Sequence, residues 1–222
     1  MNTRLLIYLL FIFSGFVGYP IAIMIFNKKY HCFTWYELIC SLIIYYLNFL
    51  LFSKIGYMII NHNFYIPLLS INNIQETFSF LFSGYAFIGG YIGTILFILF
   101  SSIFFKWNRN NLIILYMPNM LLSYGILKIG CFVKGCCGGY LIIPIQLIET
   151  IVFILFYIYI CYSMLKNKNV QIIGKNSIIL FGILRFISSL FKNYNQLYSF
   201  IVIEIMCILI IIVGYKLRWK NE

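Results

Sequence analysis

The stretch Ile126-Leu-Lys-Ile-Gly-Cys-Phe-Val-Lys-Gly-Cys-Cys-Gly-Gly139 gathers lysines, cysteines and glycines at one end of a long apolar segment. The apolar segment, about residues 112–133, has the length of a helix that crosses a bilayer. A lysine at membrane depth is costly, so its presence points to a function by default. The stretch therefore predicts a membrane helix with a polar, glycine-broken end, where a lipid headgroup can meet reactive side chains.

The rest of the chain continues this pattern. Of its 222 residues, 63% are hydrophobic and 9% are charged, and the mean hydropathy is +0.97, which excludes an ordinary soluble globule. Backbone groups in lipid must be satisfied within their own segment, so each apolar run is predicted to be a helix. We expect an all-α polytopic membrane protein forming a single domain over 1–222. Its seven spans are predicted at roughly 5–26, 36–60, 79–105, 112–133, 142–165, 176–191 and 197–215.

The positive charges predict an orientation. The first run is too long for a signal peptide and lacks a small-residue cleavage site, so it is interpreted as a retained span. Ten Lys and Arg residues lie on the side of the C-terminus and four on the other side, which predicts an outside N-terminus and a cytoplasmic C-terminus. The glycine–cysteine stretch then faces outward. The net charge of +11 does not indicate nucleic-acid binding, because the cations are scattered singly between apolar runs.

Cations within the predicted spans are the first candidate site residues. Arg185, Ser189 and Lys192 stand at i, i+4 and i+7 and share one predicted helix face. The functional interpretation is a clamp for a lipid phosphate, because a guanidinium offers a planar fork that is always charged. The alternatives are a structural ion pair with a glutamate, or snorkelling to the interface. For Lys128, phosphate binding and a stem that reaches the interface are both open.

Three other polar residues lie at membrane depth. Gln146 and Glu149 follow Pro144 and share a helix face, with Glu149 interpreted as a helix-start cap or as a site residue. Glu204 is expected to be a bundle-interior partner for a cation.

The cysteines allow three interpretations. Cys131, Cys136 and Cys137 have no nearby histidine or second cysteine pair, which disfavours zinc. A redox pair is open, although adjacent cysteines rarely form a relaxed disulfide, and packing or site-lining thiols are the third interpretation. No metal and no cofactor are predicted.

Two patterns concern packing. Gly89, Gly90 and Gly93 form a small-residue pattern that lets helices approach closely. Pro118 and Asn119 interrupt the fourth run and are expected to bend it. The longest connection, Asn61 to Thr77, is expected to lie along a membrane surface.

Six segments, in order along the chain, resemble the bacterial prolipoprotein diacylglyceryl transferases. They are Arg4–Gly15 with Tyr8 at the family's tyrosine, Ser53-Lys-Ile-Gly-Tyr57, Ser83–Gly93 in the region of the family's His-Gly-Gly-Leu, Lys128–Gly135 in the frame of Gly-Arg-x-Gly-Asn-Phe, Pro144-Ile-Gln-Leu-Ile-Glu149, and Phe181-Gly-Ile-Leu-Arg-Phe186. That family moves a diacylglyceryl group from phosphatidylglycerol to the lipobox cysteine of a lipoprotein precursor.

The resemblance implies roles for particular residues. It implies phospholipid contacts for Arg185, Lys128, Ser189, Lys192, Gly89, Gly90, Gly130, Gly135 and Gly138, catalytic roles for Tyr8, Cys131 and Cys136, and supporting roles for Gln146 and Glu149. Glu204 is expected to support the site as well, from its position at membrane depth. The resemblance also implies the bacterial cytoplasmic (inner) membrane as location, and phosphatidylglycerol or another phospholipid and a lipobox-containing precursor as partners.

The departures from the family pattern affect the chemistry. Ile88 stands at the histidine position, and Lys128 and Lys192 stand for arginines. With the histidine absent, Cys131 or Cys136 as a thiolate near Lys128 is a candidate base, since a neighbouring cation lowers a thiol pKa. We therefore expect a diacylglyceryl transferase. The alternatives are a non-catalytic lipid or lipopeptide binder or transporter on the same fold, and a membrane thiol oxidoreductase.

Overall fold

Seven long helices make up the described part of the chain. The computed structural model describes residues 3–61, 85–135, 144–166, 169–192 and 197–216. The helices are α1 (Thr3–Tyr30), α2 (Trp35–Ile60), α4 (Phe87–Phe104), α5 (Arg109–Lys134), α6 (Ile145–Lys166), α7 (Val170–Leu190) and α8 (Leu197–Lys216). Each is long and apolar enough to cross a membrane. The predicted all-α, seven-span membrane protein is therefore confirmed.

Helix boundaries differ most from the prediction at α4 and α7. The third span was predicted from residue 79, whereas α4 begins at Phe87; residues 62–84, which include most of the predicted surface connection, lie outside the described residues. The sixth span was predicted from residue 176, whereas α7 begins at Val170. Its first turns contain Gly174 and Lys175, which lower the local hydropathy without preventing a helix.

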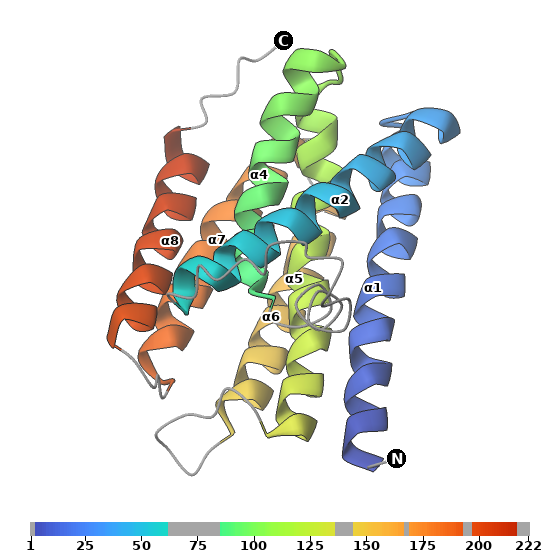
Figure 1. Cartoon of the computed structure of the whole chain (residues 1–222). Helices are drawn as coiled ribbons and strands as arrows, with labels where there is room; N and C mark the ends of the chain where they lie inside the picture. Colours follow the sequence, from blue (N-terminus) through green and yellow to red (C-terminus); the bar gives the residue numbers. More distant parts are fainter. Residues whose placement is uncertain (1–2, 62–84, 136–143, 167–168, 193–196, 217–222) are drawn as a thin grey trace, which may run out of the picture.

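Helix α5 occupies the centre of the bundle. It packs against α1, α4, α6 and α7, and it is the most buried of the seven spans. Figure 1 shows α1 and α8 at opposite sides of the bundle, with α5 behind the oblique α2. The central position of α5 means that polar side chains near its end can meet side chains from several other helices.

Glycines let α4 lie directly against α2. A Cβ on Gly89 would stand 2.4 Å from the Phe52 carbonyl oxygen and 2.9 Å from the Cα of Gly56. A Cβ on Gly90 would stand 2.3 Å from the Ser53 hydroxyl. The predicted close approach at these small residues is therefore confirmed, and it brings α2 across α4 (Figure 1).

Helix α5 continues through Pro118 despite the predicted interruption. The side chain of the next residue is satisfied within the bundle, because the Asn119 amide donates to the Leu115 carbonyl at 2.7 Å and its oxygen accepts from the Tyr157 hydroxyl at 3.1 Å. Helix α5 ends at Gly135, whose φ of 73° is left-handed and favours glycine. One uninterrupted helix therefore carries residues 109–134 from one end of the bundle to the other.

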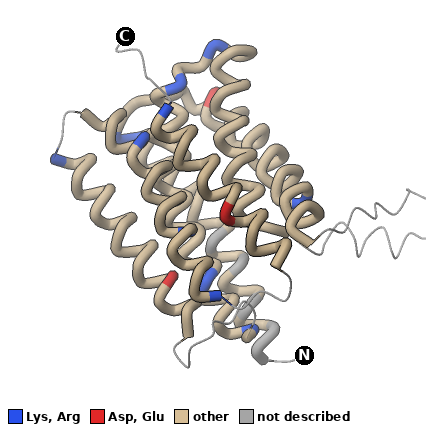
Figure 2. The backbone as a smooth tube through the Cα atoms, turned by 90° about the vertical axis from the view of Figure 1, so that its left-hand side faces the viewer, with Lys and Arg blue, Asp and Glu red and all other residues tan. Residues whose placement is uncertain are grey.

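The charged residues gather toward the ends of the bundle. Figure 2 shows one group of cations at the end where the C-terminus lies and a second toward the end where the N-terminus lies. Lys28, Lys29, Lys166 and Lys216 lie in the last turns of α1, α6 and α8, at the C-terminal end. The second group includes the residues of the candidate site.

Candidate functional site

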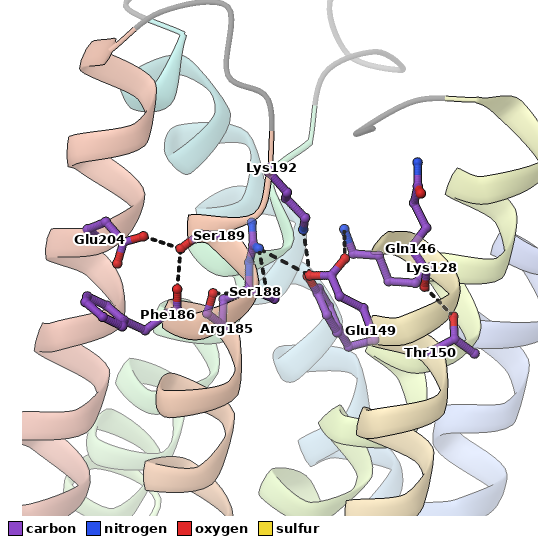
Figure 3. A network of polar contacts seen from close by, with 11 residues as sticks. Lys128, Gln146, Glu149, Thr150, Arg185, Phe186, Ser188, Ser189, Lys192 and Glu204 are labelled. Atoms are coloured by element: carbon purple, nitrogen blue, oxygen red, sulfur yellow. Dashed lines mark hydrogen bonds and ion pairs between the residues drawn. The ribbon is translucent and has the colours of Figure 1, made fainter. Parts of the chain in front are cut away.

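A buried carboxylate, Glu149, receives three cations from other parts of the fold. Lys128 Nζ lies 3.3 Å from Glu149 Oε2, and Lys192 Nζ lies 2.6 Å from Oε1. The Arg185 guanidinium lies 3.4 Å from the same Oε1. We call Lys128, Arg185 and Lys192 the cation cluster; Figure 3 shows it around Glu149. All four side chains are at least nine-tenths buried.

Helical spacing on three elements brings these groups together. Glu149 lies four residues after the start of α6, just past its first turn. Lys128 lies near the end of α5, and Arg185 lies in the last two turns of α7. Lys192 follows α7 by two residues, and its backbone N–H donates to the Ser189 carbonyl at 3.1 Å. The site therefore depends on the packing of α5, α6 and α7 against one another.

Tyr124 forms one wall of the site. Its hydroxyl donates to Glu149 Oε1 at 3.1 Å. Lys128 Nζ lies 5.0 Å from the centre of its ring, and the Arg185 guanidinium lies 6.0 Å from it. A ring face beside a desolvated cation is favourable. Tyr124 also packs on Phe181, so the wall beneath the cations is apolar. Sequence reasoning missed this residue, although its i, i+4 spacing from Lys128 is a signal that could have identified it.

The site carries an excess of positive charge. Three cations contact one carboxylate, which leaves a formal excess of two positive charges among these four side chains. The chain as a whole has 16 basic and 5 acidic residues. Buried charges are costly unless they are compensated, and two lysines and an arginine supply point charges and a bidentate fork suited to phosphate. The arrangement is chemically an anion site with a built-in carboxylate that holds the cations in place.

Glu149 is therefore not a helix-start cap. Helix α6 has no acidic residue in its first turn, and the Glu149 carboxylate instead contacts side chains of α5 and the α7 end. The cap interpretation was wrong because the carboxylate lies past the first turn, where the unpaired backbone N–H groups end.

Ser189 turns its hydroxyl to α8 and not to the Arg185 guanidinium. Its hydroxyl is within hydrogen-bond distance of the Glu204 carboxylate on α8 and of the Phe186 carbonyl (Figure 3). Ser188 is the serine that contacts the Arg185 guanidinium, at 3.3 Å. Glu204 was expected to meet a cation, whereas the structure places it against Ser189. Its Oε2 is buried without a hydrogen-bond partner among the described residues.

The remaining predicted site residues are placed as follows. Cys131 is half-buried near the end of α5, and Gln146 is buried at the start of α6. Gly130 is buried within α5, Gly135 ends it, and Gly89 and Gly90 face α2. Ile88 lies in the apolar core. Cys136 and Gly138 lie outside the described residues, as does the side chain of Tyr8 within α1. In the described part of the chain, no three His, Cys, Asp or Glu residues are grouped as metal ligands.

Comparison with known proteins agrees with the resemblance noted in the sequence. The family model described as prolipoprotein diacylglyceryl transferase matches residues 2–219. No curated protein matches the chain. The match covers nearly the whole chain, and the chain therefore belongs to the prolipoprotein diacylglyceryl transferase family.

Proposed function

We propose that this family member transfers a diacylglyceryl group from phosphatidylglycerol, or another phospholipid, to the cysteine thiol of a lipoprotein precursor. The observation that carries the proposal is the cation cluster, in which three buried basic side chains share the carboxylate of Glu149. A phospholipid brings one negative charge on its phosphate, which offsets part of that positive excess. Family membership supports a transferase in general, and the cluster supports a phosphate-bearing substrate.

The reaction requires stabilisation of a departing phosphate. The thiol sulfur attacks the glycerol carbon that bears the phosphate, the carbon–oxygen bond breaks, and glycerol phosphate leaves with one more negative charge than it had in the lipid. Arg185 and Lys128 are held by Glu149 before substrate arrives. Cations that are already oriented toward developing charge lower the barrier without reorganising at the moment of reaction.

The location of the cluster suits substrates that reach the protein from the membrane. The cluster involves the last turns of α5 and the end of α7, at the opposite end of the bundle from the basic last turns of α1, α6 and α8 (Figure 2). The positive-inside rule assigns that basic end to the cytoplasm. On this proposal the protein lies in the bacterial cytoplasmic membrane with an outside N-terminus, and the cluster is near the outer face, where a precursor presents its cysteine.

A second candidate function is a binder or transporter of lipid or lipopeptide without turnover. The observation that favours it is Ile88, a buried apolar residue at the position where the family resemblance places a histidine. The two functions share the phosphate site and differ in whether a proton acceptor is present. They are therefore separated by turnover and not by lipid binding.

The test uses purified protein, phosphatidylglycerol labelled in its acyl chains, and a lipobox peptide. We expect labelled peptide with the unmodified protein. Arg185→Gln should weaken transfer by at least about tenfold, because removing one charge-assisted contact costs about 1.5–3 kcal/mol. Lys175→Gln, which removes a cation from the opposite end of α7, is the matched control and should retain transfer. Bound phospholipid without any labelled peptide would favour the binder instead.

A further inference from the structure

The proton of the attacking thiol needs an acceptor. We propose that Lys192 is this acceptor, so that the site gains one positive charge at the moment when the leaving group gains one negative charge. The inference rests on the proposed transferase function and names a further catalytic residue for it. It is carried by the position of Lys192 in the cation cluster and by the charges that surround it.

Lys192 is the most deeply buried member of the cluster. Its side chain is 4% exposed, against 9% for Lys128 and 10% for Arg185. Its Nζ shares Glu149 Oε1 with the Arg185 guanidinium and the Tyr124 hydroxyl. One carboxylate oxygen thus accepts from three donors, so its negative charge balances the charges of Lys192 and Arg185 only in part.

Every neighbouring element contributes to the electrostatic environment of Lys192. Helix α5 contributes Lys128 and Tyr124, α6 contributes Glu149, and α7 contributes Arg185. Helix α8 contributes the Cys207 thiol, whose electrostatic surroundings include Arg185, Glu204 and Lys192. Burial lowers the pKa of Lys192 well below its ordinary value, and the Arg185 and Lys128 charges lower it further, while Glu149 offsets part of this.

The other two cations are less suited to accept a proton. A guanidinium does not lose its proton in proteins, so Arg185 stays charged. The Lys128 ammonium lies over the Tyr124 ring and 3.3 Å from Glu149 Oε2, the carboxylate oxygen that it does not share with Arg185 or Lys192. Buried lysines, by contrast, shift their pKa readily and serve as general bases. Lys192 is therefore the member of the cluster that changes its protonation state.

The charges balance before and after the reaction. With Lys192 neutral, Lys128, Arg185 and Glu149 sum to one positive charge, which matches the single negative charge of a phosphodiester. During transfer the sulfur–carbon bond forms, the carbon–oxygen bond of the lipid breaks, and the thiol proton moves to Lys192 Nζ. The site then carries two positive charges, and the glycerol phosphate that it holds carries two negative charges.

Proton uptake tests the proposal without turnover. Titration calorimetry in buffers of different ionisation enthalpy counts the protons taken up when the protein binds glycerol phosphate. At pH 8 this ligand is a dianion, because its second pKa is about 6. We expect about one proton for the unmodified protein, because a dianion in the site favours the charged form of Lys192. We expect none for Lys192→Arg, whose guanidinium is already charged. Glycerophosphoglycerol, a monoanion, should cause no uptake with either protein. Uptake that is equal in the two proteins, or absent from both, would overturn the assignment.

Turnover provides the second test. Lys192→Arg keeps the positive charge and removes the base, so we expect transfer to fall by about 10²–10⁴-fold while phospholipid binding is retained. Transfer by the unmodified protein should rise with pH to a plateau once Lys192 is neutral, since only neutral Lys192 accepts a proton. Transfer by the variant should instead keep rising up to about pH 8.5, because it depends on thiolate that the substrate cysteine forms without help from the protein. Lys134→Arg, in the last turn of α5, is the matched control and should retain transfer.

The failures of the two proposals are distinguishable. If the unmodified protein transfers and Lys192→Arg transfers equally well, Lys192 is not the acceptor and the transferase stands. If the unmodified protein does not transfer under any condition, the transferase proposal fails. The assignment of Lys192 as the base of that reaction then fails too, even if Lys192 takes up a proton when glycerol phosphate binds.

Discussion

Replacing Glu149 with glutamine should destabilise the protein strongly. The substitution keeps the shape of the side chain and removes the negative charge that the cation cluster shares. Oε1 accepts from Lys192 at 2.6 Å, from Tyr124 at 3.1 Å and from Arg185 at 3.4 Å, and Lys128 lies 3.3 Å from Oε2. The variant therefore leaves the whole cluster buried without its counter-charge.

The magnitude follows from the burial. Removing one partner of a buried ion pair costs about 3–5 kcal/mol, and Glu149 serves three such pairs at 1% side-chain exposure. We expect a loss of about 3–5 kcal/mol in the free energy of unfolding. The loss does not multiply with the number of pairs, because Lys192 can give up its proton when the carboxylate is removed. Glu37→Gln is the control, since Glu37 belongs to a capping box at the start of α2, and it should cost below about 1 kcal/mol.

The assay is denaturant titration in micelles, with and without glycerol phosphate. If the cluster is an anion site, added glycerol phosphate should take the place of the lost carboxylate and stabilise Glu149→Gln more than the unmodified protein. A ligand at 100 times its Kd contributes about 2.7 kcal/mol. A loss below about 1 kcal/mol in the variant, together with no extra stabilisation by glycerol phosphate, would refute the reasoning from shared charge.

Three further predictions concern topology, packing and the cysteines. A cytoplasm-specific reporter fused after Glu222 should be active, and activity of a periplasmic reporter alone would reverse the orientation. Gly89→Leu should lower the free energy of unfolding by about 1–3 kcal/mol or more, since the added side chain meets backbone of α2; Gly18→Ala, with no atom within 4 Å of the added Cβ, is its control in the same thermal unfolding measurement. Replacing Cys131 and Cys136 together with serine should change transfer by less than about tenfold, whereas a loss of about 10²-fold would assign the base to a thiolate instead of Lys192.

The sequence alone predicted the fold class and the approximate position of each span. This succeeds because a bilayer allows few solutions: an apolar run of the right length must satisfy its own backbone groups, so it forms a helix. The same reasoning missed the start of α7, where Gly174 and Lys175 lower the hydropathy of residues that are nevertheless helical. Glycine spacing in α4 also predicted a close helix contact, since only small residues permit it.

Spacing along one helix predicted part of the candidate site. It placed Arg185 and Lys192 near each other, because side chains at i and i+7 share a helix face, and the two remain close although Lys192 follows the end of α7. It also placed Ser189 with them, whereas the structure turns the Ser189 hydroxyl to Glu204 on α8. A side chain at the edge of a helix face can contact either of two neighbouring groups, and the position of the adjacent helix determines which one it contacts.

Only the tertiary structure decided that Lys128 and Glu149 meet the two cations at the end of α7. The buried face of a helix can be recognised from the sequence when that face differs in polarity from the opposite one. Membrane helices are apolar nearly all round, so this contrast is missing. The sequence of α6 therefore carries little information about which way Glu149 points. Packing of α6 and α7 on the central α5 sets that direction, and only this packing turns separate polar residues, far apart in the chain, into one positively charged site.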